Sequence, residues 1–144
     1  METEGAEGAV RGEGYALARP SDLGEGPGFR KVRRALGVEA FGVNAIVLPP
    51  AYETGRHYHE TQEELYFVHS GEVEFTFGED DSHRLGPGGL VRVDAPTVRR
   101  VRNLSDSEEA VYIVVGGKGG YVGRDGRLPE GEQSRFGPGA PPGA

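Results

Sequence analysis

The stretch GRHYHETQEELYFVHSG, residues 55–71, places two histidines and a run of glutamates directly before an apolar segment. In an extended strand residues two apart point the same way, so His57 and His59 present both imidazoles to one face. Glu64 begins the next apolar segment and shares its face with Tyr66. Two imidazoles and one carboxylate on one side of an ion form the ligand set of non-haem iron sites, and imidazole also suits Zn, Ni, Cu and Mn. If that face is the interior, the sequence predicts a site for a divalent transition metal (Fe, Mn, Ni, Cu or Zn) at these three residues.

Other histidines and glutamates of the stretch have different expected positions. By strand alternation Glu63 and His69 face away from the interior. His83 lies near a turn, and we expect it, like His69, to be structural or exposed. A His-x-His pair alone is a weak signal, so the metal prediction depends on Glu64 and on the strand context.

Short alternating apolar segments recur along the chain, and turns rich in Gly and Pro separate them. Helical periodicity is scarce. The segments expected as strands are Phe41–Leu48, Leu65–Val68, Glu72–Phe77, Leu90–Val93, Val98–Leu104 and Val111–Val115. We expect the second and third of these to pair as a hairpin. The pattern predicts an all-β domain, an antiparallel sandwich or barrel.

The two ends differ in composition from the middle of the chain. Residues 1–14 are almost all Glu, Gly and Ala, and residues 137–144 read GPGAPPGA. Neither end can bury enough apolar area to offset the entropy of ordering, so we expect both to be disordered tails. The 144 residues then correspond to one folded domain over residues 15–136.

Charge and composition exclude several classes of protein. The formal net charge is −7, there is no cysteine, and no apolar run is long enough for a membrane span. The N-terminus lacks a secretory signal pattern, so we expect a soluble cytoplasmic protein. Two basic clusters, residues 30–34 and 99–102, are interpreted as solvated or ion-paired surface, and no nucleic-acid partner is expected on this acidic chain.

The opening stretch resembles the first motif of the cupin superfamily, a family of small jelly-roll β-barrels. That motif is a glycine, five residues, His-x-His, three or four residues, Glu, six residues and Gly. Here His57 and His59 are followed by four residues and Glu64, and six further residues precede Gly71. Ala51 stands where the opening glycine is expected.

The second cupin motif is present in altered form. It is a glycine, five residues, Pro-x-Gly, two residues, His, three residues and Asn. Gly88 and Asn103 stand in register with it. Asp94 replaces the proline, Pro96 replaces the second glycine, and Arg99 replaces the histidine that would be the fourth metal ligand.

An arginine at the fourth ligand position allows three arrangements. Guanidinium stays protonated and has no lone pair, so Arg99 cannot be a ligand. Without metal, Arg99 and Glu64 can form a neutral buried pair bonded to the histidines. With a divalent metal the cavity is positive unless a carboxylate or phosphate bridges the metal and Arg99. In the third arrangement Arg99 turns outward beside Arg100, and the site keeps three protein ligands and water.

The resemblance covers residues 41–115 and implies a single-domain cupin whose barrel holds a small molecule. We expect a divalent metal on the three first-motif ligands, with Arg99 and Tyr66 contacting a small anionic metabolite. Such a protein could be a metal-dependent enzyme, since oxygenation, isomerisation and lyase reactions all occur in families of this kind. The alternative is a metal-free binding or sensor module in which Arg99 contacts an anionic ligand or pairs with Glu64.

The strand after the histidines is apolar on both faces. Leu65 and Phe67 point opposite to Tyr66 and Val68, so one face fills the barrel and the other needs a cover. A partner subunit or the N-terminal segment Tyr15–Leu36 can supply it. We therefore expect a homodimer that buries Leu65 or Phe67, or that covers them with an exchanged N-terminal segment.

Overall fold

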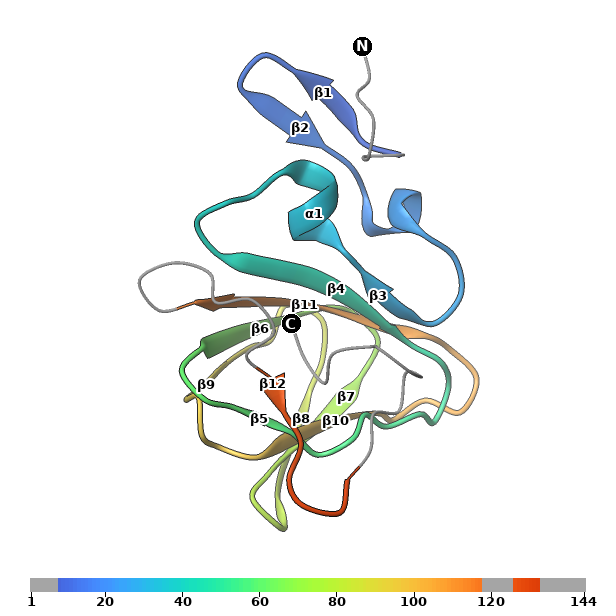
Figure 1. Ribbon diagram of the computed structural model, residues 1–144. Helices are drawn as coiled ribbons and strands as arrows, with labels where there is room; N and C mark the ends of the chain where they lie inside the picture. Colours follow the sequence, from blue (N-terminus) through green and yellow to red (C-terminus); the bar gives the residue numbers. More distant parts are fainter. Residues whose placement is uncertain (1–7, 118–125, 133–144) are drawn as a thin grey trace.

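The structure is a computed structural model and describes residues 8–117 and 126–132. Strands dominate it, and short helical turns occur near the N-terminus (Figure 1). In chain order the elements are β1 (Val10–Gly12), β2 (Tyr15–Leu17), the 3-10 turn η1 (Pro20–Leu23), β3 (Gly28–Arg30), α1 (Val32–Leu36), β4 (Gly42–Leu48), β5 (Tyr58–His59), β6 (Glu63–Ser70), β7 (Val73–Phe77), β8 (Asp81–Leu85), β9 (Leu90–Val93), β10 (Arg99–Asn103), β11 (Ala110–Gly117) and β12 (Gly126–Arg127).

Two antiparallel sheets form the body of the molecule. One has the strand order β3-β4-β11-β6-β9 and the other has the order β10-β7-β8. The segment leading into β5 lies beside β10, because the His57 N–H donates to the Arg99 carbonyl at 3.0 Å and the Arg99 N–H donates back at 2.9 Å. Most neighbouring strands are not consecutive in the chain, as in a jelly roll. The prediction of an all-β antiparallel barrel is confirmed.

The core lies between the two sheets and follows strand alternation. In β6 the side chains of Glu64, Tyr66 and Val68 are buried, whereas Leu65 and Phe67 remain exposed. The same alternation runs through β11 and β10. The buried apolar cluster comprises Ile46, Leu48, Tyr66, Val68, Val73, Phe75, Val93, Val101, Ala110, Tyr112 and Val114. The metal-site candidates therefore share an interior with this cluster.

The hairpin expected between Leu65–Val68 and Glu72–Phe77 does not form. β6 pairs with β11 and β9, whereas β7 pairs with β10 and β8, so the connection crosses from one sheet to the other. Gly71 makes this crossing with φ +86°, a value that favours glycine, and a Cβ there would lie 2.7 Å from the Cβ of Ala110. The turn residues located the connection correctly, but local alternation does not say whether a turn closes a hairpin or changes sheets.

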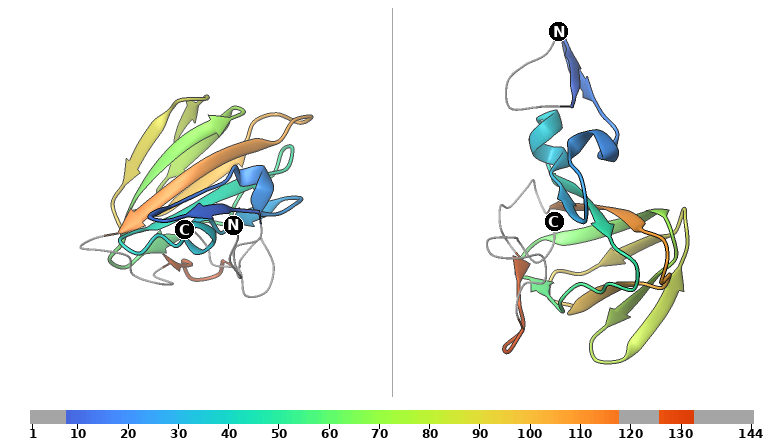
Figure 2. Two further views of the ribbon diagram at one scale, coloured as in Figure 1. Left: turned by 90° about the horizontal axis from the view of Figure 1, so that it is seen from above. Right: turned by 90° about the vertical axis from the view of Figure 1, so that its right-hand side faces the viewer.

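The N-terminal part begins earlier than the sequence predicted. We expected disorder through Gly14, yet β1 and β2 form a two-stranded hairpin with Val10 opposite Leu17. The Glu- and Gly-rich composition did not predict this short strand. Backbone pairing with β2 and a hydrogen bond from Arg11 to the Ala35 carbonyl hold it in place. The hairpin stands above α1, which contacts β4 (Figures 1 and 2).

Some predictions are not decided by this fold. The expected tails at residues 1–7 and 137–144 lie outside the described residues, and the C-terminal domain limit of 136 stays a prediction. Among the described residues, no helix is long and apolar enough to cross a membrane.

Candidate metal centre

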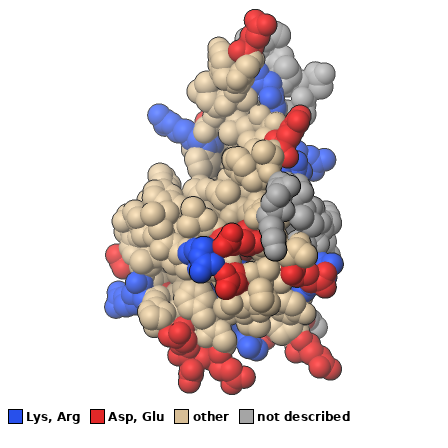
Figure 3. Space-filling view, turned by 90° about the vertical axis from the view of Figure 1, so that its left-hand side faces the viewer, with Lys and Arg blue, Asp and Glu red and all other residues tan. Residues whose placement is uncertain are grey.

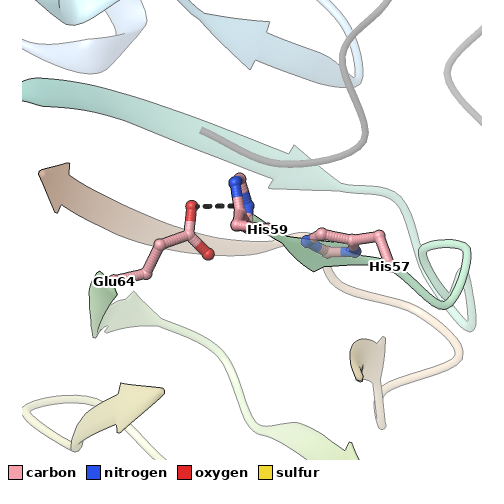
Figure 4. Close-up of side chains that lie close together, drawn as sticks. All are labelled: His57, His59 and Glu64. Carbon is pink, nitrogen blue, oxygen red and sulfur yellow. Dashed lines mark ion pairs between the residues drawn. The ribbon is translucent and has the colours of Figure 1, made fainter. Parts of the chain in front are cut away.

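The structure brings His57, His59 and Glu64 together inside the barrel. His57 lies just before β5, His59 ends β5, and Glu64 is the second residue of β6 (Figure 4). All three are buried, with no more than 2% of any of them exposed. The period-two alternation of the two strands explains why all three side chains point inward. This is the cluster that the sequence predicted.

The three side chains are close enough to share one ion. One ligand atom from each residue lies within 4.8 Å of those of the other two. His59 Nε2 and Glu64 Oε2 are 3.1 Å apart. Two ligands at about 2.0–2.2 Å from a metal, roughly at right angles, are separated by about 3 Å, so this pair already has a suitable spacing. The cluster is compatible with a divalent metal.

His57 presents its second ring nitrogen to the interior. Its Nδ1 lies 3.3 Å from the Gly55 carbonyl, a contact that favours the tautomer with the proton on Nδ1. Among the described residues Nε2 has no hydrogen-bond partner, although it is buried. Burial lowers the pKa of His57 to about 4, against the opposing effect of the Glu64 carboxylate and with help from Arg99. The imidazole is therefore neutral at pH 7, the form that binds metals.

Glu64 is ionised and held in place from two sides. Burial would raise its pKa, but the hydrogen bond with His59 and the charges of His59 and Arg99 outweigh burial and lower the pKa to about 2. The Tyr66 hydroxyl donates to Oε1 at 2.6 Å, which leaves Oε2 directed at His59. Burial, reinforced by the Glu64 charge, raises the pKa of Tyr66, so that its hydroxyl stays protonated.

Arg99 points into the barrel and is fully buried. It forms a backbone pair with His57, and residues paired in this way project to the same face. Its Nη2 is 3.9 Å from Glu64 Oε1 and donates to the Asp94 carbonyl at 3.0 Å. The arrangement in which Arg99 turns outward is therefore wrong. Nε of this guanidinium has no hydrogen-bond partner among the described residues.

The residues expected to lie outside the site do so. The side chains of Glu63 and His83 are exposed on β6 and β8, and His69 is exposed near the end of β6. Glu63 pairs with Arg92 at 3.0 Å on the outer face. None of these groups reaches the buried cluster.

Two buried polar residues were missed from the sequence. Gln62 is completely buried, and its side chain lies over Gly116, where an added Cβ would approach the Gln62 amide nitrogen to 2.7 Å. Gln62 stands two residues before Glu64, so alternation could have placed it on the inner face. Asn103 is also completely buried, and its amide nitrogen lies within hydrogen-bond distance of three carbonyls, those of Leu48, Pro49 and Glu108.

Comparison with known proteins places this geometry in a family. The family described as "Cupin domain" matches residues 45–116, half of the chain. None of the curated proteins searched matches the sequence significantly.

Solved structures share the fold at low sequence identity. An uncharacterized conserved protein with a double-stranded β-helix domain from Klebsiella pneumoniae is 22% identical with a TM-score of 0.56, covering 63% of this chain and 76% of that one. A sugar phosphate isomerase from a cupin superfamily of Silicibacter pomeroyi is 24% identical, with a TM-score of 0.59 and coverage of 76% and 71%. A structure of DMSP lyases is 27% identical, with a TM-score of 0.54 and coverage of 62% of this chain but 44% of that one.

Proposed function

Because this chain belongs to the cupin family, we propose that it binds a divalent transition metal at His57, His59 and Glu64, with a small anionic molecule bound beside the metal at Arg99. One observation carries the proposal: two imidazoles and an ionised carboxylate are buried together, with ligand atoms within 4.8 Å of one another. Buried polar groups in folded proteins normally have partners, and an ion is the partner that this donor set fits.

The donor set supports a borderline transition metal. Two imidazoles with one carboxylate suit Fe, Mn, Ni, Cu or Zn, and the lack of cysteine in the chain removes thiolate ligation. When bound, such an ion supplies Lewis-acid polarisation of a ligand oxygen or activation of bound water. Tyr66 and the Gly55 carbonyl hold Glu64 and His57 in orientation for this role.

Arg99 supports an anionic ligand. Within residues 8–117 and 126–132, Glu64 is the carboxylate beside Arg99, so the charge of a divalent ion would be uncompensated there. A carboxylate or phosphate group would neutralise that charge and accept hydrogen bonds from the guanidinium, whose Nε has no partner in the part of the chain that the structure describes. Tyr66 donates to Glu64 in this structure, and a contact between Tyr66 and the ligand stays a prediction.

A second candidate is a metal-free binding or sensor module. The observation that favours it is the closeness of Arg99 to Glu64 and of Glu64 to His59, 3.9 Å and 3.1 Å, because these groups already form an internally balanced polar cluster. In such a module Arg99 is the main contact to an anionic ligand, or it forms an ion pair with Glu64 and contacts no ligand. Metal content separates the two candidates.

Any reaction that this protein catalyses is expected at the same metal site. One matched structure at 27% identity is of DMSP lyases, so lyase activity is the first to assay. Metal content after reconstitution decides between a metal-dependent enzyme and a metal-free binding module.

Metal analysis after reconstitution tests the proposal. Chelator-treated protein is incubated separately with Mn, Fe, Ni, Cu and Zn, then desalted and measured by plasma mass spectrometry. We expect about one equivalent of one of these metals per chain, and its loss in His59→Ala and Glu64→Gln. Matched controls are His69→Ala and His83→Ala, which remove exposed imidazoles and should retain the metal. Near-zero content in the parent protein would refute the metal site and leave the metal-free module.

A further inference from the structure

The exposed apolar side chains fall into two separate groups. The described part of the chain exposes seven large apolar side chains. Three of them, Val10, Tyr15 and Leu17, lie on the β1–β2 hairpin, and we call them the hairpin face. The other four, which we call the outer patch, are Phe41, Leu65, Phe67 and Leu90. Each of the seven is at least 39% exposed, so within one chain neither group covers the other.

The hairpin presents its apolar face to solvent. Val10 and Leu17 are opposite one another in the ladder, and the Tyr15 ring lies over Gly12. The opposite face carries Arg11, which binds the α1 backbone at Ala35. The right-hand view of Figure 2 shows the hairpin standing clear of the barrel. A two-stranded hairpin is marginally stable in water, so an uncovered apolar face on it calls for a partner.

Part of the outer patch borders a hollow on the outer face of the five-stranded sheet. A cavity of about 480 Å³ is lined by Phe41, Leu65 and Val115, among others, and by the Arg92–Glu63 ion pair. We call it the sheet groove. Figure 3 shows a broad area without charged side chains on one side of the barrel, with a group of charged side chains beside it. The groove therefore combines an apolar floor with a charged margin.

The register of the sheet makes the patch continuous. Leu65 lies between Val115 of β11 and Arg92 of β9. Phe67 lies in the next row, between Ile113 and Leu90. The helix α1 contacts β4, whereas Leu65 and Phe67 of β6 and Leu90 of β9 stay exposed.

We propose that two copies of this chain form a symmetric dimer in which the hairpin face of each copy fills the sheet groove of the other. A two-fold axis makes the exchange reciprocal, so a single contact type covers both exposed groups on both chains. A flat sheet face would leave the hollow unfilled, and apolar atoms beside an empty space lose their packing contacts. A projecting hairpin can place side chains in it.

The exposed area is of the size that a dimer needs. At about 80–100 Å² of exposed surface for each of these partly exposed large side chains, the two groups offer about 600 Å² per chain. A standard interface buries about 800 Å² per partner, and the polar margin of the groove supplies more surface.

Cysteine cross-linking tests the exchange directly, because the chain has no native cysteine. Full-length Leu17→Cys and Leu65→Cys proteins are mixed, allowed to exchange subunits, and oxidised. We expect a disulfide-linked product of twice the 15.4 kDa chain mass in the mixture, and little in either variant alone. The matched control pairs Leu17→Cys with Arg84→Cys, an exposed position on β8 that should not cross-link.

Other outcomes overturn the proposal. Efficient cross-linking of Leu65→Cys with itself would show a flat pairing of sheets, and a monomer by light scattering would show that no dimer forms. As a second measurement, Leu17→Asp and Leu65→Asp should each weaken dimerisation at least about tenfold, whereas Arg84→Asp should not. Both leucines are about half exposed, so these substitutions leave the core intact. Unchanged dimerisation in both variants would contradict the exchange.

Discussion

Arg99 occupies the position at which the second cupin motif has a histidine, and it lies fully buried beside Glu64. Its inward orientation follows from its backbone pairing with His57 and from the alternation of β10, in which residues 99, 101 and 103 are buried. A buried guanidinium requires compensation, and Glu64 with two backbone carbonyls supplies it. The ligand properties of the site therefore depend on this one substitution.

Arg99→His should bind a divalent metal more tightly than the parent, by at least about tenfold, because a nitrogen donor replaces a positive charge. The same change should weaken small carboxylates and phosphates by about 1.5–3 kcal/mol, the value of a charge-assisted hydrogen bond. Calorimetry with each ligand class measures the two effects separately. The control is Arg100→His, whose side chain is partly exposed. Unchanged affinity for both ligand classes would remove Arg99 from the site.

The stability of the metal-free protein should fall on acidification because of His57. Its pKa is about 4 in the folded state against 6.5 as the ordinary value, so the unfolded state binds more protons between these pH values. Stability is therefore lost as the pH falls from about 6.5 to about 4, by roughly 3 kcal/mol in total, with no further loss from His57 below that window.

Urea unfolding in chelator at a series of pH values measures this loss. His57→Gln should lack most of the slope between pH 6.5 and 4, whereas the exposed control His69→Gln should keep it. Glu64 should add a separate loss below pH 4.5, since its folded pKa is lowered to about 2. Equal slopes in the parent and in His57→Gln would show that His57 is not buried as a neutral group.

At the scale of strands, alternation predicted which residues face inward better than it predicted which strands pair. The inner face of β6 and the positions of His57 and His59 followed from the period of two. Gln62 obeys the same rule but was missed because a glutamine is ordinarily exposed. The pairing of β6 with β11, and not with β7, depends on contacts between segments distant in sequence, which no local pattern encodes.

Asn103 connects the end of β10 by hydrogen bonds to the end of β4 and to the loop before β11. Its amide nitrogen lies within hydrogen-bond distance of the carbonyls of Leu48, Pro49 and Glu108, and its oxygen accepts from the Ser105 N–H at 3.0 Å. Asn103→Ala should cost about 3 kcal/mol of unfolding free energy, because several hydrogen bonds of a buried side chain are lost together. Chemical denaturation measures the loss.

The control for Asn103 is its neighbour Arg102, which faces outward and is half exposed. Arg102→Ala should change the unfolding free energy by less than about 0.5 kcal/mol. An equally small effect in Asn103→Ala would mean that the loop after β10 needs no such support.

At the scale of the whole molecule, the sequence predicted the barrel and the buried cluster of His57, His59 and Glu64, but not the structure of the N-terminal part. The first motif and the regular spacing of Gly and Pro turns are strong local signals, and the matched family covers residues 45–116. β1 and β2 are only three residues each, and their composition resembles that of a disordered tail. The hairpin face and the outer patch can be recognised as exposed apolar surfaces only from the three-dimensional structure.

Both imidazoles, those of His57 and His59, should bind one metal inside the barrel. X-ray absorption spectroscopy of the zinc-reconstituted protein tests it most directly, because imidazole rings give characteristic scattering beyond the first coordination shell. We predict nitrogen and oxygen ligands at about 2.0–2.2 Å with scattering from both His57 and His59, reduced to that of a single ring in His57→Ala. A first shell of oxygen alone, or a spectrum unchanged in His57→Ala, would contradict the site.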